Sequence, residues 1–154
     1  MRRGKQRQKG FTLLEILVAL LVLSIGLLGL AGLQTFSLRN NHSAFLRSQA
    51  VVLAYDALDR LRSNRDQAML GTGSAYNTSF SQAAGSYSTT GCSSNCTSSD
   101  LATYDLATWK DDVARLPAGQ AQISIDANNK ATVRVRWSDN RDGNVLTVAV
   151  ETLL

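Results

Sequence analysis

The sequence has very little of the residue types from which most catalytic and metal sites are built. Among its 154 residues there is one histidine, one proline and two cysteines. His42 has no second histidine to share a zinc ion, and no Ser/His/Asp set can be placed around it. Asp111 and Asp112 are neighbours on a predicted helix and therefore point apart, and no glycine-rich phosphate loop follows a predicted strand. The sequence predicts a protein that is not an enzyme and needs no metal or cofactor.

Long apolar runs are also scarce, with one exception near the N-terminus. From Ile16 to Leu33 the only residues that are not apolar are Ser24 and three glycines. As a helix this run is ~27 Å long, close to the thickness of a bilayer core. After Leu33 no second run is apolar enough to cross a membrane. We therefore expect a single-pass protein whose basic N-terminus is cytoplasmic and whose remaining chain lies outside.

Acidic residues are absent from the first ten positions, which carry five basic residues. Without that leader, 11 basic and 12 acidic residues remain, so the net charge of +4 becomes −1. The basic character belongs to the leader and gives no argument for nucleic-acid binding by the body.

The apolar run does not end like an ordinary secretory signal, because no A-x-A-like site follows it. Hydropathy alone therefore indicates an uncleaved signal anchor. Glu15 does not fit that interpretation easily, because a carboxylate in the apolar layer costs ~2.5–3.5 kcal/mol.

The residues around Glu15 explain its presence. The stretch Gly10-Phe11-Thr12-Leu13-Leu14-Glu15 resembles the processing motif of type IV prepilins and related pseudopilins. The resemblance implies that prepilin peptidase cuts between Gly10 and Phe11 and that the new amine of Phe11 is N-methylated. It also implies that Glu15 recruits the subunit into a filament by pairing with a neighbour's N-terminal amine. The alternative is a glutamate that reaches back to the headgroups.

A helix is predicted well beyond the membrane, because no proline or glycine occurs from Gln34 to Arg65. We expect one helix from about Thr12 to Asn64, with residues 11–33 in the membrane and residues 34–65 as its amphipathic continuation. Gly26, Gly29 and Gly32 are explained either by close packing of helices or by a weak point that bends. Residues at spacings of three and four form the predicted apolar stripe: Ala50, Val51, Ala54, Tyr55, Leu58 and Leu61.

The remaining chain, residues 66–154, is predicted to be a small periplasmic domain. Residues 66–99 are rich in Gly, Ser, Thr and Asn and are expected to be loop, with a structural disulfide between Cys92 and Cys96. Residues 100–116 are expected to form a short amphipathic helix that starts at a Thr97–Asp100 cap. Alternating apolar residues then predict a three-stranded antiparallel meander over 120–154. The predicted fold class is α+β and type IV pilin-like, a long N-terminal helix packed on a small antiparallel sheet.

A narrower resemblance covers most of the chain. The segments "VALLVLSIGLLGLAGLQ", "LATYDLATWKDDVARLPAGQ" and "VRVRWSD", with the two close cysteines, look like the PilV class of minor pilins, the type IV pilus modification proteins. That class implies incorporation in or at the tip of a pilus, priming of pilus assembly, and support of twitching motility and adhesion. The implied partners are prepilin peptidase, other minor pilins, the major pilin and the inner-membrane assembly platform. The implied location is the bacterial inner membrane, and the pilus after assembly.

Two alternative functions stay open. A minor pseudopilin of a type II secretion system would carry the same leader and long helix. A membrane-anchored binding module, for DNA or a surface ligand, is the other, because Arg134 and Arg136 share one strand face near Lys130. Asp126 and Asp139 lie close in sequence, so a solvated sheet face is the simpler interpretation and nucleic acid is not an expected partner.

Overall fold

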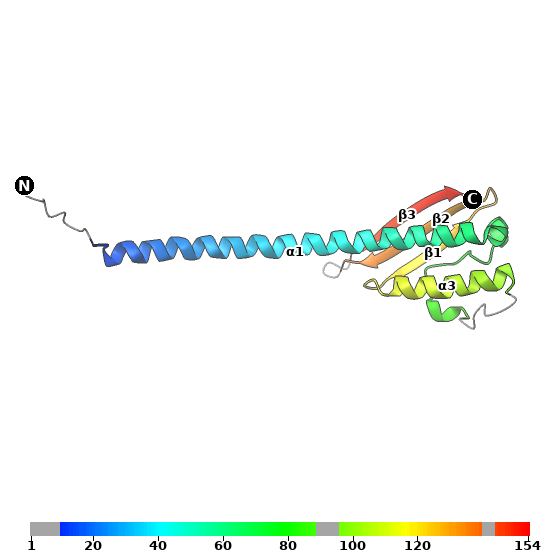
Figure 1. Ribbon diagram of the computed structural model, residues 1–154, viewed down its shortest axis with the longest axis horizontal. Coiled ribbons are helices and arrows are strands. Elements are labelled where there is room, and N and C mark those ends of the chain that lie inside the picture. Colours follow the sequence, from blue (N-terminus) through cyan, green and yellow to red (C-terminus); the bar gives the residue numbers. More distant parts are fainter. Residues whose placement is uncertain (1–9, 89–95, 140–143) are drawn as a thin grey trace, which may run out of the picture. The chain divides into compact units, whose positions relative to one another are not determined.

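The computed structural model describes residues 10–88, 96–139 and 144–154 (Figure 1). The chain divides into two compact units, Met1–His42 and Ser43–Leu154, and each is described by itself. The elements in chain order are α1 (Leu13–Ser63), α2 (Arg65–Ala68), η1 (Gly71–Gly73), η2 (Ala84–Ser86), α3 (Ser98–Ala114), β1 (Gln120–Ile125), β2 (Lys130–Ser138) and β3 (Val145–Leu153).

Helix α1 is unbroken over 51 residues, and it buries a narrow face in the second unit. That face is rich in alanine, which lets neighbouring elements approach the helix closely. Tyr55, which we expected in the apolar stripe, is 52 % exposed, and Val51 is only half-buried. Both lie on one margin of the stripe, because successive residues are rotated by about 100° around a helix. The buried residues of α1 are Leu46, Ala50, Ala54, Ala57, Leu58 and Leu61.

Helix α3 starts at Ser98, two residues before the predicted start. The Thr97 side chain accepts a hydrogen bond from the Asp100 N–H, and the Asp100 side chain accepts one from the Thr97 N–H. This reciprocal cap fixes the start of the helix. The face predicted from spacings of three and four is buried throughout: Ala102, Leu106, Trp109, Val113 and Leu116.

The three strands form one antiparallel sheet in the order β1-β2-β3. Alternate residues of β2, namely Val133, Val135 and Trp137, are almost completely buried and face α1 and α3. The corresponding residues of β3 (Leu146, Val148 and Val150) are only half-buried. The predicted fold class is confirmed: the protein is α+β, with a long N-terminal helix packed on a three-stranded antiparallel sheet.

The segment expected to be a loop over residues 66–99 holds more structure than its composition indicates. It contains α2, η1 and η2, and it contributes Tyr76, which is completely buried in the core. Thr78 forms an isolated bridge with Ile123. The predicted Cys92–Cys96 disulfide involves Cys92, which lies outside the described residues. No described cysteine is a free thiol, and the pairing stays a prediction.

The turn that joins α3 to β1 depends on a glycine, which gives a testable prediction. A Cβ atom at Gly119 would lie 2.0 Å from the Val113 carbonyl oxygen, so backbone would have to move. We expect Gly119→Ala to lower the free energy of unfolding by about 2–4 kcal/mol. Denaturant unfolding followed by fluorescence reports on the core directly, because the only two tryptophans, Trp109 and Trp137, are buried there.

Gly85→Ala is the matched control, because a Cβ there meets no atom within 4 Å. Equal stability of the two variants would show that the turn does not need its glycine.

Candidate functional site

The first residues of α1 place a carboxylate at the start of the helix. Helix α1 begins at Leu13, and the Thr12 hydroxyl accepts a hydrogen bond from the Glu15 N–H at 3.3 Å. The Thr12 carbonyl accepts from the N–H groups of Glu15 and Ile16. Thr12 therefore caps the helix, and Glu15 lies in its first turn, where the helix dipole favours a negative charge.

The bond predicted to be cut lies just before this helix. Gly10 and Phe11 belong to no helix or strand, and Phe11 is 79 % exposed. The Gly10–Phe11 peptide bond is therefore accessible in the chain itself. Among the residues that the structure describes, none forms a hydrogen bond or an ion pair with the Glu15 carboxylate. Its negative charge is therefore not compensated by any of them.

The helix behind Glu15 is apolar and uncovered. Its most apolar stretch has a mean hydropathy of 2.7, and none of that stretch is buried within the chain. By length and composition this helix can cross a membrane. Ser24 and Thr35 donate their hydroxyl hydrogens to the carbonyls of Leu20 and Ala31, so neither hydroxyl is left unpaired.

Gly26, Gly29 and Gly32 do not interrupt α1. A Cβ atom at any of the three would meet no atom within 4 Å. Among the described residues, therefore, nothing packs against the three glycines, and the helix continues through them. Both explanations from the sequence, close helix packing and a weak point, concern neighbouring subunits.

Within the second unit, the end of α1 is joined to the rest by a largely buried polar cluster, which we define as Arg60, Asn64, Tyr76, Asp105 and Thr108. The Tyr76 hydroxyl donates to Asp105 Oδ2 at 2.5 Å and accepts from Asn64 Nδ2 at 3.2 Å. Arg60 donates to Asp105 Oδ1 and to the Thr108 hydroxyl at 3.3 and 2.7 Å. Burial and the hydrogen bond to Asp105 both raise the pKa of Tyr76 far above its usual value, so it stays a neutral donor. The cluster joins α1, the segment after it and α3.

Lys110 on α3 makes a second set of contacts between α3 and the preceding segment, and its side chain is buried. Its ammonium donates to the backbone carbonyls of Ser79 and Gln82 at 2.7 and 2.5 Å and lies 5.6 Å from the centre of the Tyr87 ring. Burial lowers the pKa of Lys110 to about 8. Lys110 thus holds residues 79–87 against α3, and nothing in the sequence indicated this role.

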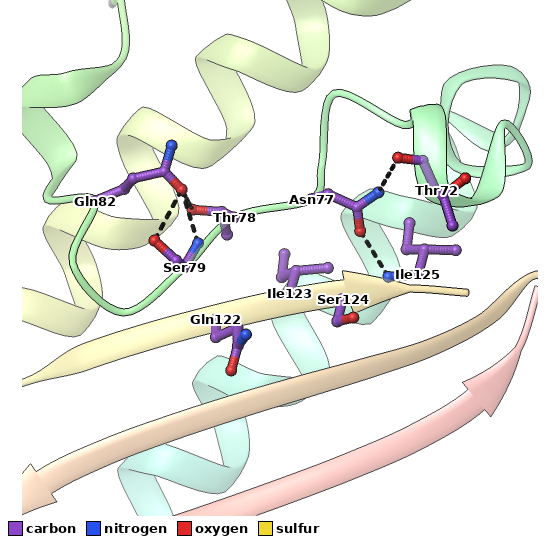
Figure 2. A pocket seen from close by; sticks show the side chains of 9 residues that line it. All are labelled: Thr72, Asn77, Thr78, Ser79, Gln82, Gln122, Ile123, Ser124 and Ile125. Atoms are coloured by element: carbon purple, nitrogen blue, oxygen red, sulfur yellow. Dashed lines mark hydrogen bonds between the residues drawn. The ribbon is translucent and has the colours of Figure 1, made fainter. Parts of the chain in front are cut away.

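A groove of about 410 Å³ runs along β1, between that strand and residues 72–82 (Figure 2). Four of its polar side chains are already engaged within the chain: Asn77, Thr78, Ser79 and Gln82. Asn77 accepts from the Ile125 N–H and donates to the Gly71 and Thr72 carbonyls, and Gln82 Oε1 accepts from the Ser79 N–H. The lining contains no charged residue and no base that could activate one of its serine or threonine hydroxyls.

The cations on the open face of the sheet are largely engaged. Lys130 pairs with Glu151 at 2.5 Å. Arg136 donates to Gln120 Oε1 and stacks on Phe80, 4.0 Å from the ring centre. Asp126 accepts from backbone N–H groups in the β1–β2 turn, and its charge, with the larger effect of Glu151, raises the pKa of Lys130. Lys130 and Arg136 therefore do not form a basic patch with free charges.

The residues weighed for catalysis or metal binding are not assembled into a site. Asp111 and Asp112 both lie near Arg115, at 3.8 and 3.3 Å, on the surface of α3. Across the described ranges, no three His, Cys, Asp or Glu side chains come close enough to hold a metal ion.

Comparison with known families agrees with the motif at the N-terminus. Residues 5–31 match the prokaryotic N-terminal methylation motif, and residues 32–107 match the family described as type IV pilin Tt1218. The two matches adjoin and together cover residues 5–107, which include all of α1 and more than half of α3. No curated protein and no solved structure matches the chain.

The burial of Lys110 predicts how stability depends on pH. Its pKa is about 8 in the folded chain and 10.5 in the unfolded chain, so between these values only the unfolded chain holds the proton. Stability should therefore rise with pH in this window, by about 1.5 kcal/mol from pH 8 to pH 9.5. Denaturant unfolding of the full chain in detergent at several pH values measures this.

Lys110→Met provides the control, since it keeps the buried stem and removes the titrating group. Its stability should be flat over the same pH range. A rise of equal size in Lys110→Met would assign the effect to other groups. The window ends below pH 10, because ionisation of Tyr76 is opposed by the fold and lowers stability at higher pH.

Proposed function

We propose that this chain, a type IV pilin with an N-terminal methylation motif and a Tt1218-like domain, is a minor pilin of the PilV class. The methylation motif means that prepilin peptidase processes it, and the family is structural and not enzymatic. In this proposal the peptidase cuts between Gly10 and Phe11, and the new Phe11 amine is methylated. The subunit then leaves the bacterial inner membrane and enters a pilus, in the shaft or at the tip.

The observation that carries the proposal is the start of α1. Thr12 caps the helix, so after cleavage the Phe11 amine lies one residue before the cap and Glu15 lies one turn into the helix. A carboxylate and an ammonium therefore enter the apolar layer at similar depth. The carboxylate lacks a partner among the described residues, and a neighbouring subunit's amine supplies one. That pairing offsets the cost of keeping Glu15 in the membrane.

The exposed helix supports assembly rather than simple anchoring. A helix that only anchors a domain is surrounded by lipid. A glutamate in such a helix costs free energy that no other interaction offsets. A helix that packs among others like it can place that glutamate against a cation. We infer that other minor pilins, the major pilin and the inner-membrane assembly platform are the partners of this segment.

The specific role that we propose is to help prime pilus assembly and so to support twitching motility and adhesion. It is supported by the segments that resemble PilV proteins and by the two close cysteines, Cys92 and Cys96, which we propose form a disulfide after translocation. The second candidate is a minor pseudopilin of a type II secretion system, which the same N-terminal motif would serve.

The role of Glu15 can be tested by substitution. We expect Glu15→Ala to insert in the membrane as well as the wild type does, because it removes a charge from an apolar helix. Its incorporation into filaments should fall by at least about ten-fold, the effect of losing an interaction of about 1.4 kcal/mol or more. Membrane fractions and sheared filaments are compared by quantitative mass spectrometry.

Glu151→Ala is the matched control, because Glu151 is the only other glutamate in the chain and lies on β3. Wild-type incorporation of Glu15→Ala would contradict the proposed pairing, and equal loss in both variants would point to a general effect of lost charge.

The two assembly systems are separated by deleting the gene. We expect the deletion to reduce surface pili and twitching motility while secretion of exoproteins continues, because a pilus subunit has no part in secretion. Normal piliation with lost secretion would instead assign the chain to a type II secretion system.

A further inference from the structure

The two edges of the sheet differ in how they are covered. On the β1 edge, the Thr78 N–H donates to the Ile123 carbonyl at 2.9 Å, and Asn77 Oδ1 accepts from the Ile125 N–H at 2.7 Å (Figure 2). Two outward backbone groups of β1, the Ile123 carbonyl and the Ile125 N–H, are thus bonded within the chain itself. A strand that paired with this edge would have to displace residues 77–78.

The β3 edge has no such cover. Strand β3 is the last in the sheet, and among the described residues no strand or backbone group bonds to its outer side. The strand is nine residues long and contains no proline, lysine or arginine. Its one charge, Glu151, is paired with Lys130. Natural edge strands usually carry charges, prolines or bulges that prevent pairing, and β3 has almost none of these features.

The side chains of β3 also leave apolar surface uncovered. On the face toward α1, Leu146, Val148 and Val150 are half-buried, whereas their neighbours on β2 are no more than 1 % exposed. Val145 and Leu153, at the two ends of the strand, are 60 % and 74 % exposed. The core therefore continues to the β3 edge and stops there without a covering element.

Helix α1 extends this uncovered strip. Its Leu53 carbonyl and Arg60 side chain face α3, which contacts β1. Val51 and Tyr55 lie roughly 140–180° around the helix from those two residues, on the side away from α3 and toward β3. Half-buried Val51 and exposed Tyr55 thus continue the apolar strip beyond β3.

We propose that the β3 edge is a docking site for an extended segment of a different protein, which adds to the sheet as an antiparallel fourth strand. Backbone hydrogen bonds along β3 supply affinity, as in other cases of strand addition. The segment carries apolar residues at every second position, to cover Leu146, Val148, Val150 and Tyr55. Its other face is uncharged or basic where it passes Glu151.

A second copy of the chain does not fit this edge. In an antiparallel pair centred on Ala149, Glu151 would face Thr147 and no like charges would meet. However, β3 runs in the same direction as the part of α1 beside it (Figure 1), so in this pair the α1 helices of the two copies would run in opposite directions. Pilin helices that share one membrane enter from the same side. A parallel pair would place Glu151 beside Glu151, which is unfavourable. Only this exclusion of a second copy rests on the proposed function.

The test uses a peptide with the sequence of residues 145–153 (VLTVAVETL), flanked by lysines for solubility and labelled for fluorescence anisotropy. A free peptide has no anchor and can take the antiparallel register that two anchored copies cannot. The full mature chain in detergent should bind it saturably, and hydrogen exchange at residues 145–153 of the protein should slow. Because the assay needs no filament, its result is independent of the assembly role.

Two sets of N-methylated peptides distinguish strand pairing from apolar adhesion. In a strand, alternate N–H groups point to the same side. Methylating one alternate set therefore removes every hydrogen bond that the peptide donates to β3 and puts methyl groups between the two strands, whereas methylating the other set does neither. We expect one methylated peptide to lose binding and the other to bind like the parent. Equal binding of both, or no binding of the parent, would overturn the proposal.

Protein variants place the site on β3. Val148→Lys puts a charge on the half-buried face and should weaken peptide binding by at least about ten-fold. Ser124→Lys on β1 is the matched control and should bind normally, because that edge is closed. Equal weakening by both would contradict a β3 site. A full chain that dimerises in detergent and loses dimers on Val148→Lys would contradict a heterologous partner.

Discussion

A carboxylate at the start of an uncovered apolar helix is the constraint on which the rest of the molecule depends. Glu15 is one turn inside a segment of which nothing is buried by the chain itself. A charge in that position is costly, and a group of opposite sign at the same depth offsets the cost. In the proposed function, cleavage before Phe11 creates such a group at the end of every subunit. The mature protein would then carry both the amine and the carboxylate that pairs with it.

The globular unit is organised around the other end of the same helix. Alanines on α1 let α3 and the sheet approach closely, and the polar cluster of Arg60, Asn64, Tyr76, Asp105 and Thr108 fixes how they meet. Removing one member of such a buried cluster leaves the others without partners, which costs more than the contact itself contributes. The helix thus connects two different units. In the first, the apolar surface of the helix is not covered by any described residue, and the second is packed except along β3.

Regular patterns in the sequence predicted regular structure well. The spacing of Leu106, Trp109 and Val113 gave the buried face of α3, and alternation in β2 gave its inward residues. The Thr97–Asp100 pair predicted the start of α3 to within two residues, and the predicted fold class is confirmed. In each case neighbours in the chain carry the signal, so periodicity is sufficient to detect it.

Features that depend on distant partners were not predictable in the same way. Tyr76 comes from a stretch rich in Gly, Ser and Thr, yet its ring is buried in the core and its hydroxyl bonds to Asn64 and Asp105. From its residue type, Lys110 is expected on the surface. It is buried because the fold places the carbonyls of Ser79 and Gln82 next to its ammonium group. Tyr55 fits the helical stripe by spacing but is exposed, because the sheet ends at β3 and nothing covers that margin. Long-range packing overrides local pattern at these positions.

The central claim is the ion pair between Glu15 and a Phe11 amine, and one distance tests it most directly. The chain has only two glutamates and four phenylalanines, so ¹³C-carboxyl glutamate and ¹⁵N phenylalanine label few sites. The Phe11 amine is also distinct in chemical shift from the three phenylalanine amides. Solid-state NMR of assembled filaments from the Glu151→Gln variant should detect the Glu15 carboxylate, ionised, within about 4 Å of that amine. A protonated Glu15, or a carboxyl group with no dipolar coupling to the amine, would contradict the account.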